Sequence, residues 1–129
     1  EFLESNGVIN DEQHGFRRGR STVSLMISLM ERISAGLEAG LSLRACMCDL
    51  SKAFELVPHC ILLQKLEYYG IRGLPLKLLE SYLTGRSQRV EVQGVQSACY
   101  GVPCGVPQGS ILGPLLFIIF LNDLGKYVG

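Results

Sequence analysis

The sequence is short of charge, and the charge that it has is balanced. Asp, Glu, Lys and Arg make up 19% of its 129 residues, with 12 acidic residues against 12 basic ones. A free-standing nucleic-acid-binding domain is usually basic, so the zero net charge weighs weakly against that class for the whole chain. Hydrophobic residues reach 47%, which suits either a well-buried small domain or a piece of a larger one.

Paired metal-binding cysteines and a membrane-spanning run are both missing. The five cysteines show no Cys-x-x-Cys spacing, so we expect no structural zinc. Cys46 and Cys48 are two apart in an expected strand and should be small core residues on one face. The odd thiol count without a signal peptide predicts an intracellular setting, with nucleus and cytoplasm both open. The longest apolar run, residues 115–121, is too short to cross a bilayer, so we expect no membrane partner.

Apolar residues recur with helix or strand periods along most of the chain, without an internal repeat or a linker. We therefore expect one domain with mixed helices and strands. The expected elements are an irregular approach over 1–20 with a turn at Asn6-Gly7, a helix from Ser21 to about Glu38, a strand from Leu43 to Leu50, helices from Pro58 to Gly70 and from Pro75 to Gly85, a half-exposed strand around Val90 with an antiparallel partner within Ala98 to Cys104, and a last helix from about Pro114 to Asp123.

Asp49 is the most informative single residue. It follows an apolar stretch that we expect to form a strand buried on both faces. An unpaired carboxylate there would cost several kcal/mol, and the usual reason to keep one is a bound cation. Magnesium held by strand-end aspartates is the arrangement of phosphoryl-transfer enzymes. The alternative is that Asp49 caps a helical turn at Ser51, and one aspartate does not make a two-metal site.

Three blocks of sequence, taken together and in this order, resemble the reverse transcriptase domain of non-LTR (LINE-type) retrotransposons. They are Gln13-His14-Gly15-Phe16-Arg17-Arg18-Gly19-Arg20-Ser21-Thr22, Cys48-Asp49-Leu50-Ser51-Lys52-Ala53-Phe54-Glu55-Leu56-Val57-Pro58-His59, and Gly105-Val106-Pro107-Gln108-Gly109-Ser110-Ile111-Leu112-Gly113-Pro114-Leu115-Leu116-Phe117. The resemblance covers nearly the whole chain. It implies an α/β (α+β palm-type) fragment of the fingers and palm of a right-hand polymerase, with helices packed on a small sheet. Residues 1–42 would be the fingers side. Residues 43–129 would be the palm side, with the Asp49 strand and the Gln108 loop.

The resemblance also implies a reaction and a cofactor. The family's enzymes add deoxynucleotides to a DNA primer on an RNA template by two-magnesium phosphoryl transfer, so deoxynucleoside triphosphates, template and primer are the expected partners. Asp49 matches the first catalytic aspartate, which ligates both Mg²⁺ ions, and the carbonyl of Leu50 would supply a further oxygen.

Three further residues match nucleotide contacts of the family. Phe54 matches the aromatic residue under the incoming sugar, where a bulky ring blocks a 2′-hydroxyl; a plain core aromatic is the alternative. Gln108 and Gly109 match residues at the nucleotide and template-primer contact, in a loop whose glycines and Pro107 let the backbone approach a ligand closely. Glu55 departs from the aspartate that is more typical there. We expect Ser110 to cap the following helix.

Basic and histidine residues carry weaker signals. Arg17, Arg18 and Arg20 would lie in the fingers and contact template phosphates, with an ordinary solvated loop as the alternative. His14 and His59 have no Cys or Asp at nucleophile-activating spacing, and we expect structural roles for both.

The family's paired aspartates, usually in Phe/Tyr-Ala-Asp-Asp, are expected on a strand shortly beyond Gly129. With Asp49 alone, magnesium affinity should be poor, and we expect the isolated chain to be inactive. A competing interpretation is a non-catalytic nucleic-acid-binding remnant of a transposable element. A third is another reverse transcriptase branch such as an intron maturase, which the wording of the first two blocks disfavours.

Overall fold

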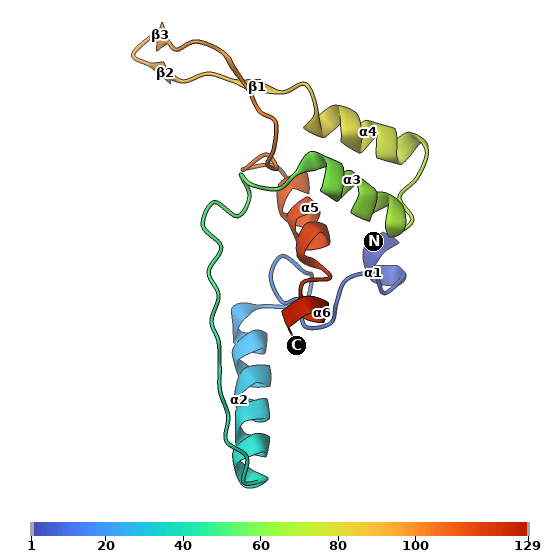
Figure 1. The fold of residues 1–129 in the computed structure, drawn as a ribbon, viewed down its shortest axis with the longest axis vertical. Helices are drawn as coiled ribbons and strands as arrows, with labels where there is room; N and C mark the ends of the chain where they lie inside the picture. The colour runs from blue at the N-terminus through green and yellow to red at the C-terminus, as the bar shows by residue number, and fades with distance from the viewer. Residues whose placement is uncertain (1, 129) are drawn as a thin grey trace. The chain divides into compact units, whose positions relative to one another are not determined.

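The computed structural model describes residues 2–128, drawn as a ribbon in Figure 1. It contains two compact units, one of Asn10–Ser51 and one of Glu1–Ile9 with Lys52–Gly129. The elements are mixed helices and short two-stranded sheets. This mixture confirms the coarse fold prediction of a chain with both kinds of element.

In the Asn10–Ser51 unit, the predicted helix is α2, Thr22–Glu38. Ser21 caps it: its Oγ accepts a hydrogen bond from the Ser24 backbone N–H at 3.2 Å, and the Ser24 hydroxyl oxygen accepts one from the Ser21 N–H at 2.9 Å. This reciprocal pair satisfies two backbone donors that the helix itself leaves open. The apolar stripe of α2 is largely exposed, and the helix buries none of its residues.

The predicted strand from Leu43 to Leu50 is wrong. Residues 41–50 have no regular secondary structure, and every one of them is exposed. A strand needs a neighbour for its N–H and C=O groups, and within residues 2–128 none of the strands pairs with this segment. Cys46 and Cys48 are therefore exposed rather than core residues, although their sulfur atoms do lie on one side, 3.9 Å apart.

The other unit is built mainly from helices. α3 (His59–Tyr68), α4 (Leu74–Leu83) and α5 (Leu112–Leu121) confirm the three predicted helices. The short helices α1 (Phe2–Ser5) and α6 (Gly125–Val128) had not been predicted, while the Asn6-Gly7 turn is confirmed. α3 packs against both α4 and α5 (Figure 1). The expectation of helices packed on a sheet is thus wrong in this unit, where helices cover one another.

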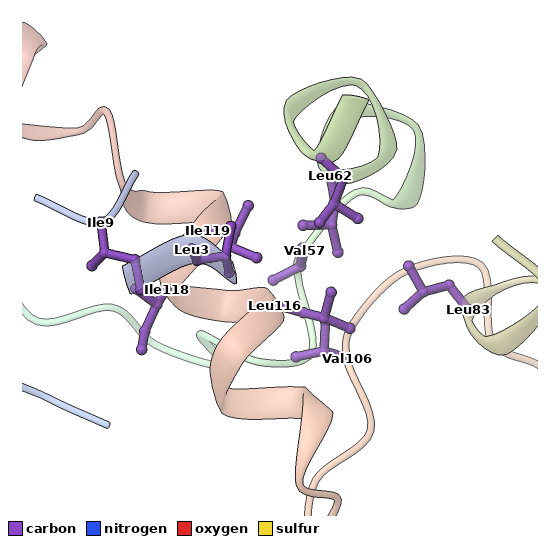
Figure 2. Close-up of a cluster of buried hydrophobic side chains, with 10 residues drawn as sticks. Leu3, Ile9, Val57, Leu62, Leu83, Val106, Leu116, Ile118 and Ile119 are labelled. Carbon is purple, nitrogen blue, oxygen red and sulfur yellow. The ribbon is translucent and has the colours of Figure 1, made fainter. Parts of the chain in front are cut away.

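The hydrophobic core lies between α3, α5 and the segments that flank them (Figure 2). Leu62 and Leu66 of α3 and Leu116 of α5 are almost fully buried, and Val57 and Val106 join them from outside the helices. α5 is apolar on all sides, and its neighbours bury or half-bury most of it. The remaining buried members are Leu3, Ile9, Leu83, Ile118 and Ile119.

The strands form a narrow ribbon. β1 (Ser87–Gln88) pairs antiparallel with β4 (Tyr100–Gly101), and β2 (Glu91–Val92) pairs with β3 (Val95–Gln96) across the Gln93-Gly94 turn. β4 lies within the expected return segment Ala98 to Cys104, but its partner is β1. The strand that contains Val92 pairs with β3 instead, so the expected pairing of these two segments is wrong. All eight strand residues are exposed, so the predicted half-burial of this ribbon is wrong.

Within residues 2–128, none of the helices combines the length and the apolar character needed to cross a membrane.

Candidate functional site

The end of the second sequence block meets the start of the third. The Gly105 N–H donates to the Val57 carbonyl at 2.8 Å, and the Val106 N–H donates to the Phe54 carbonyl at 2.7 Å. Pro58 and Cys104 form an isolated antiparallel bridge beside them. Segments about fifty residues apart are thereby joined through their backbones. We call this junction of residues 54–59 with residues 104–106 the clamp.

Gly105 is the tightest point of the clamp. Its φ is +92°, in the region that favours glycine, and a Cβ built there would lie 2.7 Å from the Glu55 carbonyl oxygen. Both the backbone conformation and the missing side chain are needed for this approach. At Gly105 this contact is with the chain itself, and the predicted close approach of the loop backbone to a ligand stays a prediction.

The clamp includes one buried histidine. His59, the first residue of α3, is 8% exposed, and its Nε2 lies 2.7 Å from the Gly105 carbonyl oxygen. A carbonyl oxygen only accepts, so Nε2 carries the hydrogen of this bond. The expected structural role of His59 at a helix start is confirmed.

The far end of the loop is anchored by Ser110. Its hydroxyl donates to the Pro107 carbonyl at 2.8 Å and accepts from the Gly113 N–H at 2.9 Å. Ser110 thus satisfies a donor in the first turn of α5, as predicted, from one residue before the helix N-cap at Ile111. Gln108 and Gly109 lie exposed between the two anchors.

Phe54 is half-buried and stacks on Phe117, with ring centroids 4.5 Å apart and 27° between the planes. It packs against the hydrophobic core. This is the environment of the core aromatic that the sequence left as the alternative. Its contact with a nucleotide sugar stays a prediction.

A polar pocket of about 530 Å³ lies against the clamp, within the same unit. Gln108 lines it, together with Gly105, Glu55 and Arg86. Arg86 also lies 5.6 Å from the Tyr82 ring centroid, within range of a cation–π contact. The pocket therefore offers an amide, a carboxylate and a guanidinium to a ligand, which is the donor and acceptor set for a polar or phosphorylated molecule.

Asp49 and Leu50 belong to the other unit, in the exposed segment 41–50. Residues 51–56 form turns, in which the N–H groups of Glu55 and Leu56 donate to the Lys52 carbonyl. The role of Asp49, as a metal ligand or as a cap of this turn, stays a prediction. Among the described residues, no cluster of three or more His, Cys, Asp or Glu could hold a metal ion. Asp49 is one exposed carboxylate and would supply one of the six oxygen ligands that Mg²⁺ takes.

The three predicted arginines differ in environment. The Arg17 side chain is 10% exposed, and its Nη1 donates to the Asn10 carbonyl at 2.9 Å. Arg20 lies 3.4 Å from Asp11, and Arg18 is exposed. Arg17 is thus engaged within its own loop, while Arg18 has a side chain open to a phosphate. Template contact by these residues stays a prediction.

An ion pair between α3 and the end of α5 was not predicted from the sequence. Lys65 donates to the Asp123 carboxylate and to the Phe120 carbonyl, the latter at 2.6 Å. The hydrogen bond from Lys65 holds the pKa of Asp123 below its ordinary value, against a smaller opposing effect of burial. Because Lys65 also satisfies a carbonyl in the last turn of α5, it ties the two helices together.

Sequence reasoning also missed Arg86 as a pocket residue. A signal was present, because residues 65–89 contain five basic residues against two acidic ones. A helix face exposed to solvent gives the same composition, so only the folded chain distinguishes Arg86 from its neighbours.

Comparison with known proteins identifies the family. The model of the family described as reverse transcriptase (RNA-dependent DNA polymerase) matches residues 2–128. The probable RNA-directed DNA polymerase from transposon X-element of Drosophila melanogaster is 33% identical over 129 residues, 95% of this chain. The corresponding protein from transposon BS of the same species is 34% identical over 130 residues, 96% of this chain. The RNA-directed DNA polymerase from mobile element jockey of Drosophila funebris is 33% identical over 112 residues, 87% of this chain.

The chain spans 13%, 14% and 12% of the length of these three relatives. It therefore matches only a part of each of them. The chain belongs to the reverse transcriptase family and is related to the reverse transcriptases of non-LTR retrotransposons.

Proposed function

We propose that this chain is the part of an RNA-directed DNA polymerase that presents a nucleotide-contact loop and one catalytic aspartate. The observation that carries the proposal is the clamp. Two of the family-like blocks meet there through paired backbone bonds, and Gln108 is held at the edge of a polar pocket. A rigidly anchored loop with an exposed polar side chain is suited to holding a ligand at a fixed position.

In this proposal, Gln108 and Gly109 contact the incoming deoxynucleotide and the template-primer, and Phe54 lies below the sugar. Support comes from the environment of each residue. Gln108 lines the pocket and can donate and accept at once. Phe54 is fixed by its stacking on Phe117, and a fixed ring excludes a 2′-hydroxyl better than a mobile one.

The proposal includes Mg²⁺ as the cofactor. Asp49 gives one oxygen ligand to Mg²⁺ in the whole polymerase, with the Leu50 carbonyl beside it. The other carboxylates in this proposal are the paired aspartates that the resemblance to the family implies. Of the three arginines, Arg18 is the first candidate for contact with template phosphates, because its side chain is exposed.

Primer extension on an RNA template, with deoxynucleotides and magnesium, tests the proposal. In the complete protein that carries this segment, Asp49→Ala should lower incorporation about a thousandfold or more. Glu38→Gln is the matched control, because it changes an exposed carboxylate near the end of α2 in the same unit; it should leave the rate unchanged. A complete protein that incorporates no deoxynucleotide would contradict the proposal.

The isolated 129-residue chain should bind a primed template weakly and incorporate nothing. Incorporation by this chain that is lost in Asp49→Ala would contradict the proposed inactivity of the piece. Salt-dependent binding of a primed template by the complete protein, without any incorporation, would instead favour a nucleic-acid-binding remnant.

A further inference from the structure

The exposed part of the loop lies between two fixed points. On one side, Gly105 and Val106 are hydrogen-bonded to the backbone of residues 54–57. On the other, Ser110 connects the Pro107 carbonyl to the first turn of α5. Gln108 and Gly109 lie between them, so their position depends on how firmly each side is held.

His59 contributes a side-chain bond to the first fixed point. It comes from a different element, α3, and reaches the Gly105 carbonyl from within the buried region. The Gly105 N–H is bonded to Val57, so both polar backbone groups of this glycine are satisfied. The peptide after Gly105 is held from two sides, because its N–H, on Val106, donates to the Phe54 carbonyl and its carbonyl, on Gly105, accepts from His59. Gly105 has no side chain to limit its own rotation, so these bonds set the direction in which the chain leaves it toward Gln108.

We infer that His59 is a positioning residue for the Gln108 loop. The Nε2–H of His59 fixes the Gly105 peptide, and the fixed peptide aims Gln108 at the pocket that takes the deoxynucleotide. The consequence for the reaction rests on the proposed function, whereas the effect on the loop does not. His59 itself is buried in the clamp and acts through Gln108 rather than on the ligand.

Side-chain chemistry supplies a rescue test. Glutamine can place an amide N–H close to the position of a histidine Nε2, whereas leucine has similar bulk and no donor, and asparagine has a donor on a shorter side chain. A positioning role therefore predicts that His59→Gln behaves like the native chain, while His59→Leu and His59→Asn do not. A role in packing alone predicts that leucine is tolerated best.

Hydrogen exchange of the Gly105 and Val106 amides, measured by NMR on the chain, is the first experiment. Both amides should exchange about tenfold faster in His59→Leu and return to within about threefold of the native rate in His59→Gln. His14→Leu is the control, because His14 bonds to Ser24 in the other unit. If His59→Leu does not fold, the glutamine and asparagine variants decide the question. Equal exchange in the native chain and the donor-free variant, or no rescue by glutamine, would overturn the inference.

Steady-state primer extension by the complete protein is the second experiment. His59→Leu should raise KM for deoxynucleotide about tenfold, with a smaller change in kcat, and His59→Gln should restore KM. If KM and kcat are both unchanged while exchange is faster, the positioning of Gln108 for the nucleotide is overturned. If the native complete protein incorporates nothing, the proposed function fails, and the exchange experiment still decides whether His59 holds the loop.

Discussion

Two neighbouring segments that both contain apolar side chains have different environments in this chain. Residues 41–50 are rich in apolar side chains, yet they are exposed and without regular structure. Residues 54–59 follow within a few positions, and they contain the fully buried Val57 and the buried His59. The difference lies in the backbone. Residues 54–59 are bonded to Gly105 and Val106, whereas no described strand pairs with residues 41–50.

Apolar composition alone therefore did not decide burial. Burying an extended segment requires partners for its peptide groups, because an unpaired buried N–H or C=O costs about 1–3 kcal/mol. The clamp provides those partners, and apolar side chains can then pack around it. The expected strand before Asp49 has the side chains for burial and lacks the partner.

The largest expected effect on stability is the difference between alanine substitutions at two glycines with positive φ. Gly105→Ala should lower the free energy of unfolding by about 4 kcal/mol, since it adds backbone strain to a clash with the Glu55 carbonyl. Gly40→Ala, where no atom lies within 4 Å of the added Cβ, should cost only about 1 kcal/mol. Urea unfolding of both variants measures the difference. Equal losses would mean that the clamp is no tighter than the exposed turn after α2.

The next largest effect on stability is the difference between alanine substitutions at a buried and at an exposed apolar side chain. Leu62→Ala should destabilise the chain by about 3 kcal/mol, because Leu62 is fully buried in the core of α3 and α5. Met47→Ala should change stability by less than about 0.5 kcal/mol, since Met47 is 89% exposed. A large loss from Met47→Ala would show that residues 41–50 are packed, and the contrast between the two segments would disappear.

The smallest effect concerns the Lys65–Asp123 ion pair beside the core. Asp123→Asn should cost about 1 kcal/mol at neutral pH, because the pair is partly buried and charge-assisted. The pKa of Asp123 lies below the ordinary value of 3.8. Its contribution is therefore complete above that value and is lost as the pH falls through the lower, folded-state pKa. Unfolding measured from pH 7 down to pH 2 should show the native chain and Asp123→Asn converging in stability as the pH falls below the ordinary value of 3.8. A difference in unfolding free energy that stays constant over this pH range would show that the stabilisation does not come from the ionised Asp123 carboxylate.

Local signals in the sequence predicted the helices well. Ser21, Pro75 and the glycines after each helix mark boundaries within a few residues of the observed ones, because caps and breakers act on their immediate neighbours. Gln108 was also named from the sequence and lines the pocket, whereas Arg86, which lines the same pocket, was not. The expected strand at Asp49 failed, because strand formation depends on a partner that no local pattern reveals.

The sequence by itself determined the family, the positions of the long helices and the loop that carries Gln108. Only the tertiary structure decided that Gly105 lies against Glu55, that His59 reaches its carbonyl, and that Lys65 joins Asp123. The physical reason is the distance along the sequence over which each kind of interaction acts. Caps, turns and helical periods act over four residues or fewer, whereas these contacts join residues about fifty apart, and they exist only once the core has brought α3 and α5 together.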